Sequence, residues 1–199
     1  MGRTRLLPCL ALLLAACTSE HVYRCSLAPD PAADRVLALA RPESTAAALR
    51  VEPFDDPGLS PADVEFLVFA SQHGLAEVVS STVALDREVR GFERDFARAM
   101  IETHLPLTQD LVALAERKGF RPPRQLTPDR QRRIDELARL RGEPLRRAYH
   151  EMQVFEHDEA LRVYGIAVEQ VEDPELRELA RATLPILRAH RDRLLPRAP

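Results

Sequence analysis

Three histidines of this chain lie in predicted helices at positions from which their rings could meet at one metal ion. His104, His157 and His190 each fall on the apolar stripe of a different amphipathic segment, or at its edge. Imidazole nitrogens are common ligands of zinc, copper and iron. If the three segments pack with these rings at one level, they form a nitrogen-rich site for one transition metal ion, either zinc, copper or iron.

Two glutamates accompany these histidines. Glu77 follows His73 by four residues, so both side chains lie on one face of a helix, one turn apart. Glu156 falls within an apolar stripe, between Met152 and Ala160. A carboxylate buried there must be neutralised, hydrogen-bonded or bound to a cation, because burying an unpaired charge is costly. We therefore expect Glu77 to act as a metal ligand with the three histidines, with Glu156 and His73 as supporting residues.

A purely structural interpretation of the same residues stays open. Each histidine could be a core or boundary side chain that hydrogen-bonds a neighbouring carboxylate or backbone carbonyl. His73 and Glu77 could share a hydrogen bond instead of an ion. Buried polar pairs of this kind can fix the register of packed helices without any ligand.

Apolar side chains that recur at steps of three and four residues predict five helices. The pairs Ser60-Pro61, Thr127-Pro128 and Asp173-Pro174 are typical helix starts, with a capping side chain followed by proline. The predicted helices span residues 60–85, 89–118, 128–141, 145–171 and 174–194.

The predicted fold class is all-α, a bundle of four long helices with one additional short connecting helix. The helix over 145–171 is expected at its centre. Bundle cores are places where facing helices position metal or cofactor ligands.

Composition agrees with one helical domain that is not built for nucleic acids. The chain has 199 residues, of which 45% are hydrophobic and 30% are charged, enough for a single full-sized core. Aromatic residues make up only 5%, and alanine, leucine, arginine and glutamate dominate, which favours helix over strand. The net charge is −3 and no basic stripe stands out, so nucleic-acid binding is disfavoured.

The first residues have the pattern of an export signal. Arg3 and Arg5 precede an apolar run that is too short to span a bilayer. The run ends in Leu-Ala-Ala-Cys at Cys17, which is similar to a bacterial lipobox. We expect three segments. Residues 1–16 form a lipoprotein signal peptide, residues 17–59 begin with the lipidated Cys17 and form a proline- and alanine-rich tether, and residues 60–196 form a helical domain.

The lipid at Cys17 would bind the chain to a membrane of the bacterial cell envelope. Thr18, rather than aspartate, follows the cysteine, which points by analogy to the outer membrane facing the periplasm. An ordinary cleaved signal peptide stays open as the alternative.

Only one thiol remains after this processing. Cys9 leaves with the signal and Cys17 becomes a thioether, so Cys25 is single. It cannot form an internal disulfide, and no catalytic role is expected for it. Intermolecular pairing through Cys25 stays open.

Several sequence blocks together resemble a known family. They are residues 66–70, 74–78, 96–104, Gly142 with Tyr149, 156–161 and 184–190, in this order. This arrangement resembles DUF4142, a family of unknown function whose members are labelled outer membrane proteins. The resemblance covers roughly Asp63 to Leu194 and implies a ferritin-like helical bundle. Thr103 stands where the family usually has aspartate before the histidine.

The sequence does not favour an enzyme. A di-iron site needs glutamate three residues before histidine on two helices, whereas Ile101, Val154 and Leu187 hold those positions before the three histidines. The sequence also lacks a glycine-rich phosphate loop, a nucleophile elbow and paired metal-binding cysteines.

We expect an envelope lipoprotein whose bundle is a binding or stress-related module. A structural or protein-interaction bundle, with an envelope protein or a second copy as partner, is the alternative, and a metal-dependent oxidase or hydrolase is less favoured.

Overall fold

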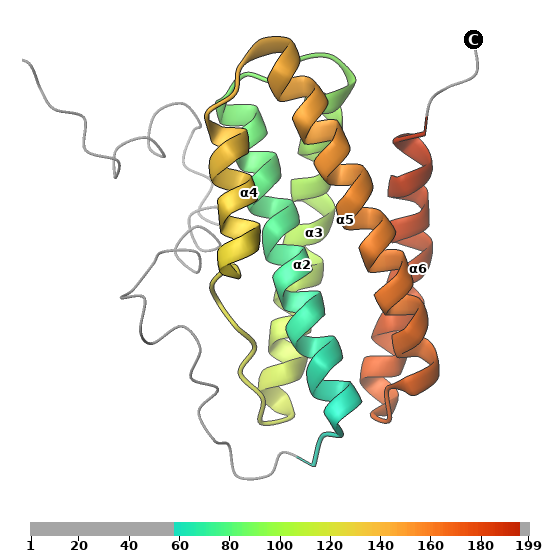
Figure 1. Ribbon diagram of the computed structural model, residues 1–199. Coiled ribbons are helices and arrows are strands. Elements are labelled where there is room, and N and C mark those ends of the chain that lie inside the picture. The colour runs from blue at the N-terminus through green and yellow to red at the C-terminus, as the bar shows by residue number, and fades with distance from the viewer. Residues whose placement is uncertain (1–57, 196–199) are drawn as a thin grey trace, which may run out of the picture.

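The computed structural model describes residues 58–195, and this part of the chain forms an all-α bundle (Figure 1). Its helices are α2 (Pro61–Asp86), α3 (Phe92–Arg117), α4 (Pro128–Ala138), α5 (Gly142–Gln170) and α6 (Pro174–Arg193). The four long helices run side by side, and the short α4 lies on the outside of the bundle. The predicted all-α bundle of four long helices and one short connecting helix is confirmed. The expected signal peptide and tether lie outside the described residues.

The central helix is α2, not α5 as the sequence suggested. Every side chain from Ala70 to Ala84 is buried, because α3, α4 and α5 all pack against α2. Hydroxyl side chains on this helix bond carbonyls of the same helix: Ser71 Oγ donates to Leu67 O at 2.6 Å, and Thr82 Oγ1 to Val78 O at 2.8 Å. Small polar residues can therefore be buried on α2 without hydrogen-bond partners from other helices. Because they interrupt the hydrophobic pattern of the sequence, that pattern does not reveal the central position of α2.

Polar side chains at the helix ends fix the bundle geometry. Ser60 and Asp63 form the predicted cap of α2, with Ser60 N donating to Asp63 Oδ2 at 2.8 Å and Asp63 N to Ser60 Oγ at 3.2 Å. The other oxygen of Asp63 accepts hydrogen bonds from the backbone of Glu172 and Asp173, at 2.9 and 3.0 Å. The start of α2 is thus tied to the turn between α5 and α6.

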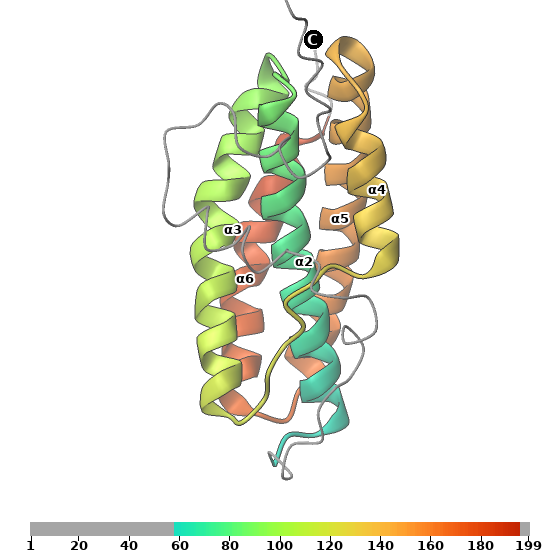
Figure 2. The same ribbon diagram turned by 90° about the vertical axis from the view of Figure 1, so that its left-hand side faces the viewer.

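A glutamine of α2 holds the segment that leads into α4. The Gln72 amide donates to Gln125 O at 2.5 Å, and its oxygen accepts from Thr127 N at 2.8 Å. This segment runs along α2 before α4 begins (Figure 2). Gln72 therefore sets where α4 starts, and with it the position of Arg130.

The apolar core is divided into two clusters. We name them the Phe96 cluster, which includes Met100 and Tyr149, and the Tyr164 cluster, which includes Leu67 and Leu187. Helices α2, α3 and α5 contribute to both clusters, whereas α6 contributes to the Tyr164 cluster and meets the Phe96 cluster only through Leu194, just beyond its end. The stretch of each helix between them carries polar side chains, and these form a layer across the middle of the bundle. None of the helices in residues 58–195 is long and apolar enough to cross a membrane.

Candidate metal centre

The polar layer brings together one histidine from each long helix: His73 of α2, His104 of α3, His157 of α5 and His190 of α6. All four are at most 7% exposed. Ring centroids of His104 and His190 lie 5.3 Å apart, and those of His157 and His190 lie 5.5 Å apart. The three histidines singled out from the sequence therefore meet in the core. His73 joins them, with its ring centroid 5.6 Å from that of His104.

Three of these rings can present nitrogens to one ion. One ring nitrogen from each of His104, His157 and His190 lies within 4.8 Å of the other two. Around a tetrahedral zinc ion, with bonds of about 2.0–2.1 Å, ligand nitrogens are about 3.4 Å apart. The three nitrogens would have to approach one another by at most about 1.4 Å to reach that spacing.

Each of the three rings has a buried nitrogen that makes no hydrogen bond. His104 Nε2, His157 Nε2 and His190 Nδ1 are buried and have no partner, a rare condition for buried polar atoms in native proteins. His157 Nδ1 lies 2.9 Å from the carbonyl oxygen of Gln153. Since only an N–H can donate to a carbonyl, Nδ1 carries the proton and Nε2 keeps a free lone pair. His157 is therefore held in the tautomer that a metal ligand requires.

Glu77 lies beside His157 but groups with other residues. Its Oε1 is 3.8 Å from Nδ1 of His157, the nitrogen that faces Gln153. The potential ligand atoms of Glu77, His73 and Glu156 lie within 4.8 Å of one another and form a second group. The structure thus divides the six expected residues into a three-histidine group and a group of one histidine and two glutamates.

Burial sets the charge state of the three-histidine group. Desolvation, followed by repulsion from neighbouring His73, lowers the pKa of His157 to about 3. Desolvation and the charge of Arg193 lower the pKa of His190 to about 4. The pKa of His104 is also well below its usual value, because of burial and the surrounding histidines. These rings are neutral near pH 7, so their lone pairs are available to a metal ion.

The two glutamates differ in their electrostatics. Burial, reinforced by the charge of Glu156, raises the pKa of Glu77 well above its usual value. Burial would also raise the pKa of Glu156, but His73 and Arg130 outweigh it, and the pKa is lowered. Glu156 is therefore the carboxylate held in its charged form.

Arg130 reaches the polar layer from α4. Its guanidinium pairs with Glu156 and, at 3.0 Å, with Glu159. It also lies 5.9 Å from the centroid of the Phe69 ring, which stacks on His73. Sequence reasoning missed Arg130, because α4 was interpreted as a connection and its arginine is 26 residues from its partner. No local sequence signal marks such a contact.

A cavity connects this layer to the outside of the bundle. It has a volume of about 170 Å³ and reaches His73 and His104. Most of its wall is apolar, with Leu107, Tyr164 and Ile186 among the lining residues. It offers an ion, several waters or a small ligand a route to both groups.

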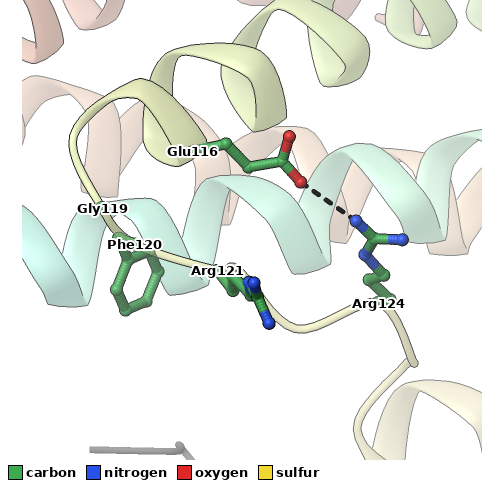
Figure 3. A pocket seen from close by; sticks show the side chains of 5 residues that line it. All are labelled: Glu116, Gly119, Phe120, Arg121 and Arg124. Atoms are coloured by element: carbon green, nitrogen blue, oxygen red, sulfur yellow. Dashed lines mark hydrogen bonds and ion pairs between the residues drawn. The ribbon is translucent and has the colours of Figure 1, made fainter. Parts of the chain in front are cut away.

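A larger hollow of about 550 Å³ lies at the end of α3, and Figure 3 shows its lining. Glu116, Gly119, Phe120, Arg121 and Arg124 line it. Arg124 donates to Glu116 at 3.0 Å. None of these residues is one of the histidines of the polar layer, so the hollow is separate from the candidate centre.

The fold is similar to that of a solved structure. A DUF305 fragment from Deinococcus radiodurans matches with a TM-score of 0.60 and 19% sequence identity, over 68% of this chain and 94% of the fragment. At this identity the match shows a shared helical fold only. No curated protein matches the chain.

The family model for a domain of unknown function, DUF4142, matches residues 49–195. This range includes all five helices and every residue of the polar layer. It also agrees with the blocks on which the sequence resemblance rested. The chain therefore belongs to the DUF4142 family.

Proposed function

We propose that this protein is a metal-binding lipoprotein of the bacterial cell envelope, and that its bundle binds a transition metal ion through His104, His157 and His190. The observation that carries the metal site is the convergence of three buried histidine rings, each of which has a ring nitrogen without a hydrogen-bond partner. The envelope location rests on the lipobox-like sequence at Cys17, which lies outside the described residues.

The donor set indicates the class of ion. Three neutral imidazoles suit zinc, copper and iron, and no thiolate is available in residues 58–195 to favour softer sites. The charged Glu156 nearby offsets part of the ion's positive charge. Three protein ligands also leave a coordination position for water or a small ligand. The proposed activity is ion binding, and no reaction is assigned to it.

The metal site accounts for more of the structure than a purely structural polar layer does. A network that only fixed helix register would be expected to satisfy its own hydrogen bonds, because an unsatisfied buried group costs about 1–3 kcal/mol. Here the layer leaves nitrogens of all four histidines and both oxygens of Glu77 without partners. A bound cation would satisfy several of these atoms at once.

Metal analysis of the purified protein tests the proposal. The chain from Thr18 onward would be treated with chelator, offered Zn²⁺, Cu²⁺ or Fe²⁺ in separate samples, desalted and analysed for metal content. We expect at least one ion per chain for the parent with at least one of these metals. A His157→Asn, His190→Asn double variant should lose that ion, because it removes two of the three ligands.

His150→Asn is the matched control, because His150 also lies on α5 but pairs with Glu93 outside the polar layer. Circular dichroism would check that each variant is folded. A parent that binds no ion, or a folded double variant that retains the parent's metal content, would contradict the proposal.

A further inference from the structure

The second group of residues in the polar layer has its own ligand geometry. His73 and Glu77 lie one turn apart on α2, and Glu156 approaches them from α5. One ligand atom from each lies within 4.8 Å of the other two. We propose that these three residues form a second metal site, distinct from the three-histidine site, so that the bundle holds two ions of different ligand chemistry.

His73 and Glu77 of this group lack hydrogen-bond partners, whereas Glu156 is paired with Arg130. Both ring nitrogens of His73 and both carboxylate oxygens of Glu77 make no hydrogen bond, and the two residues are 1% and 0% exposed. The nearest approach of His73 Nδ1 to Glu156 Oε2 is 3.6 Å, longer than a hydrogen bond. An ion between these side chains would satisfy one atom of each at bond lengths near 2 Å.

Arg130 supports this geometry instead of blocking it. It pairs with Glu156 and Glu159 together, so its positive charge is shared between two carboxylates. Carboxylates that bind metals are commonly held in orientation by hydrogen bonds from outer residues. Arg130 is thus a positioning residue for Glu156. The charge of Glu156 offsets part of that of a divalent ion, and Glu77 would bind the ion as a carboxylate after releasing its proton.

The two sites should prefer different ions. The first offers three imidazole nitrogens, whereas the second offers one nitrogen and two carboxylate oxygens. Carboxylates suit Mn²⁺, and imidazoles suit zinc and copper. The second site should therefore bind Mn²⁺ as well as Zn²⁺, and the first should bind Zn²⁺ in preference to Mn²⁺. The cavity reaches one residue of each site, His104 of the first and His73 of the second.

The experiment uses the chain from Thr18 onward with Zn²⁺ and Mn²⁺ as separate probes. Zinc would be counted after desalting, and bound Mn²⁺ would be measured from the loss of the free-ion signal in electron paramagnetic resonance. We expect two zinc ions per chain in the parent and one in Glu77→Gln, His73→Asn and His190→Asn. Mn²⁺ binding should persist in His190→Asn and fall at least tenfold in Glu77→Gln and His73→Asn.

Glu93→Gln is the matched control, because Glu93 is a buried acid that pairs with Arg146 and His150 away from the layer. Two independent variants of the second group keep the test decisive if one does not fold. Unchanged zinc content and Mn²⁺ affinity in a folded Glu77→Gln or His73→Asn variant would overturn the second site and leave the first intact. A single zinc ion that is lost in both His190→Asn and Glu77→Gln would also overturn it, because it would show one shared site. Absence of any bound ion in the parent would reject both sites.

Discussion

Histidines and carboxylates occupy the middle of this bundle, where apolar side chains would usually pack. The ring of His157 and the carboxyl group of Glu77 are both fully buried. Such residues lower the stability of the metal-free protein, because each leaves polar atoms unsatisfied. Sites that bind ligands often retain unfavourable local interactions of this kind.

The depressed histidine pKa values predict that the metal-free protein loses stability in acid. In the folded state the pKa is about 3 for His157 and about 4 for His190, against 6.5 for an ordinary histidine. As the pH falls below about 6.5 the unfolded chain binds protons that the folded chain does not, so these histidines lower the free energy of unfolding until about pH 4 for His190 and about pH 3 for His157. The ideal slope for the fully buried His157 is about 1.4 kcal/mol per pH unit. Urea unfolding with chelator at several pH values between 7 and 4 measures this loss.

Two variants test the sign of this effect. His157→Gln should make the acid loss shallower, because it removes a group that stays neutral only in the folded state. Glu77→Gln should make the loss of stability in acid steeper. The reason is that the raised pKa of Glu77 contributes stability at low pH, which is lost as the pH rises through the folded pKa and which the variant lacks. An unchanged pH dependence of the free energy of unfolding in His157→Gln would contradict the conclusion that the buried His157 ring stays neutral in the folded protein.

At the scale of the helices, α2 and α3 are in close contact at Gly74. A Cβ atom added there would overlap Oγ1 of Thr108, which is held by its hydrogen bond to His104 O at 2.7 Å. We expect Gly74→Ala to lower the free energy of unfolding by about 1–3 kcal/mol through overpacking. Urea unfolding at pH 7 measures the change.

Gly165 of α5 provides the comparison, because a Cβ atom there would meet nothing within 4 Å. Gly165→Ala should raise the free energy of unfolding by about 0.5–1 kcal/mol, as expected for alanine in a helix interior. Adding Thr108→Ala to Gly74→Ala should recover part of the loss. Equal effects of the two single glycine substitutions would show that helix propensity, and not the contact between α2 and α3, determines the result.

Local signals predicted the helices but not how they are rotated against one another. The capping residues Ser60, Thr127 and Asp173 were identified from sequence, and the structure places each at a helix N-cap. The pattern placed His73 and Glu77 on one face of their helix, one turn apart. Because α2 is buried on every side over residues 70–84, that face lies in the core, and only tertiary packing shows which neighbours it meets.

At the scale of the whole molecule, the proposed envelope location predicts lipidation at Cys17. A Cys17→Ser variant of the full chain, expressed in a diderm bacterium, should move from the membrane fraction to the soluble fraction and lose incorporation of labelled fatty acid. Cys25→Ser is the matched control and should stay in the membrane fraction. A Cys17→Ser protein that retains labelled fatty acid would contradict lipidation at this residue.

The overall fold was more predictable than the composition of its core. Helical periodicity and the caps are enough to indicate four long helices and a short one, and His104, His157 and His190 follow from their places on the apolar stripes. The contribution of Arg130 and the division of the ligands into two groups depend on contacts between distant segments, such as the pairing of Arg130 with Glu156. Sequence spacing carries no information on such contacts.

The division of the core into the Phe96 and Tyr164 clusters has a mechanical consequence. Residues 58–195 contain no cysteine, so no disulfide joins the helices of the bundle. The two groups of the polar layer draw ligands from α2, α3, α5 and α6. Ions bound there would act as cross-links between all four long helices, at the level where apolar packing is interrupted. Coordination bonds would then stabilise the middle of the bundle, and apolar contacts would stabilise its two ends.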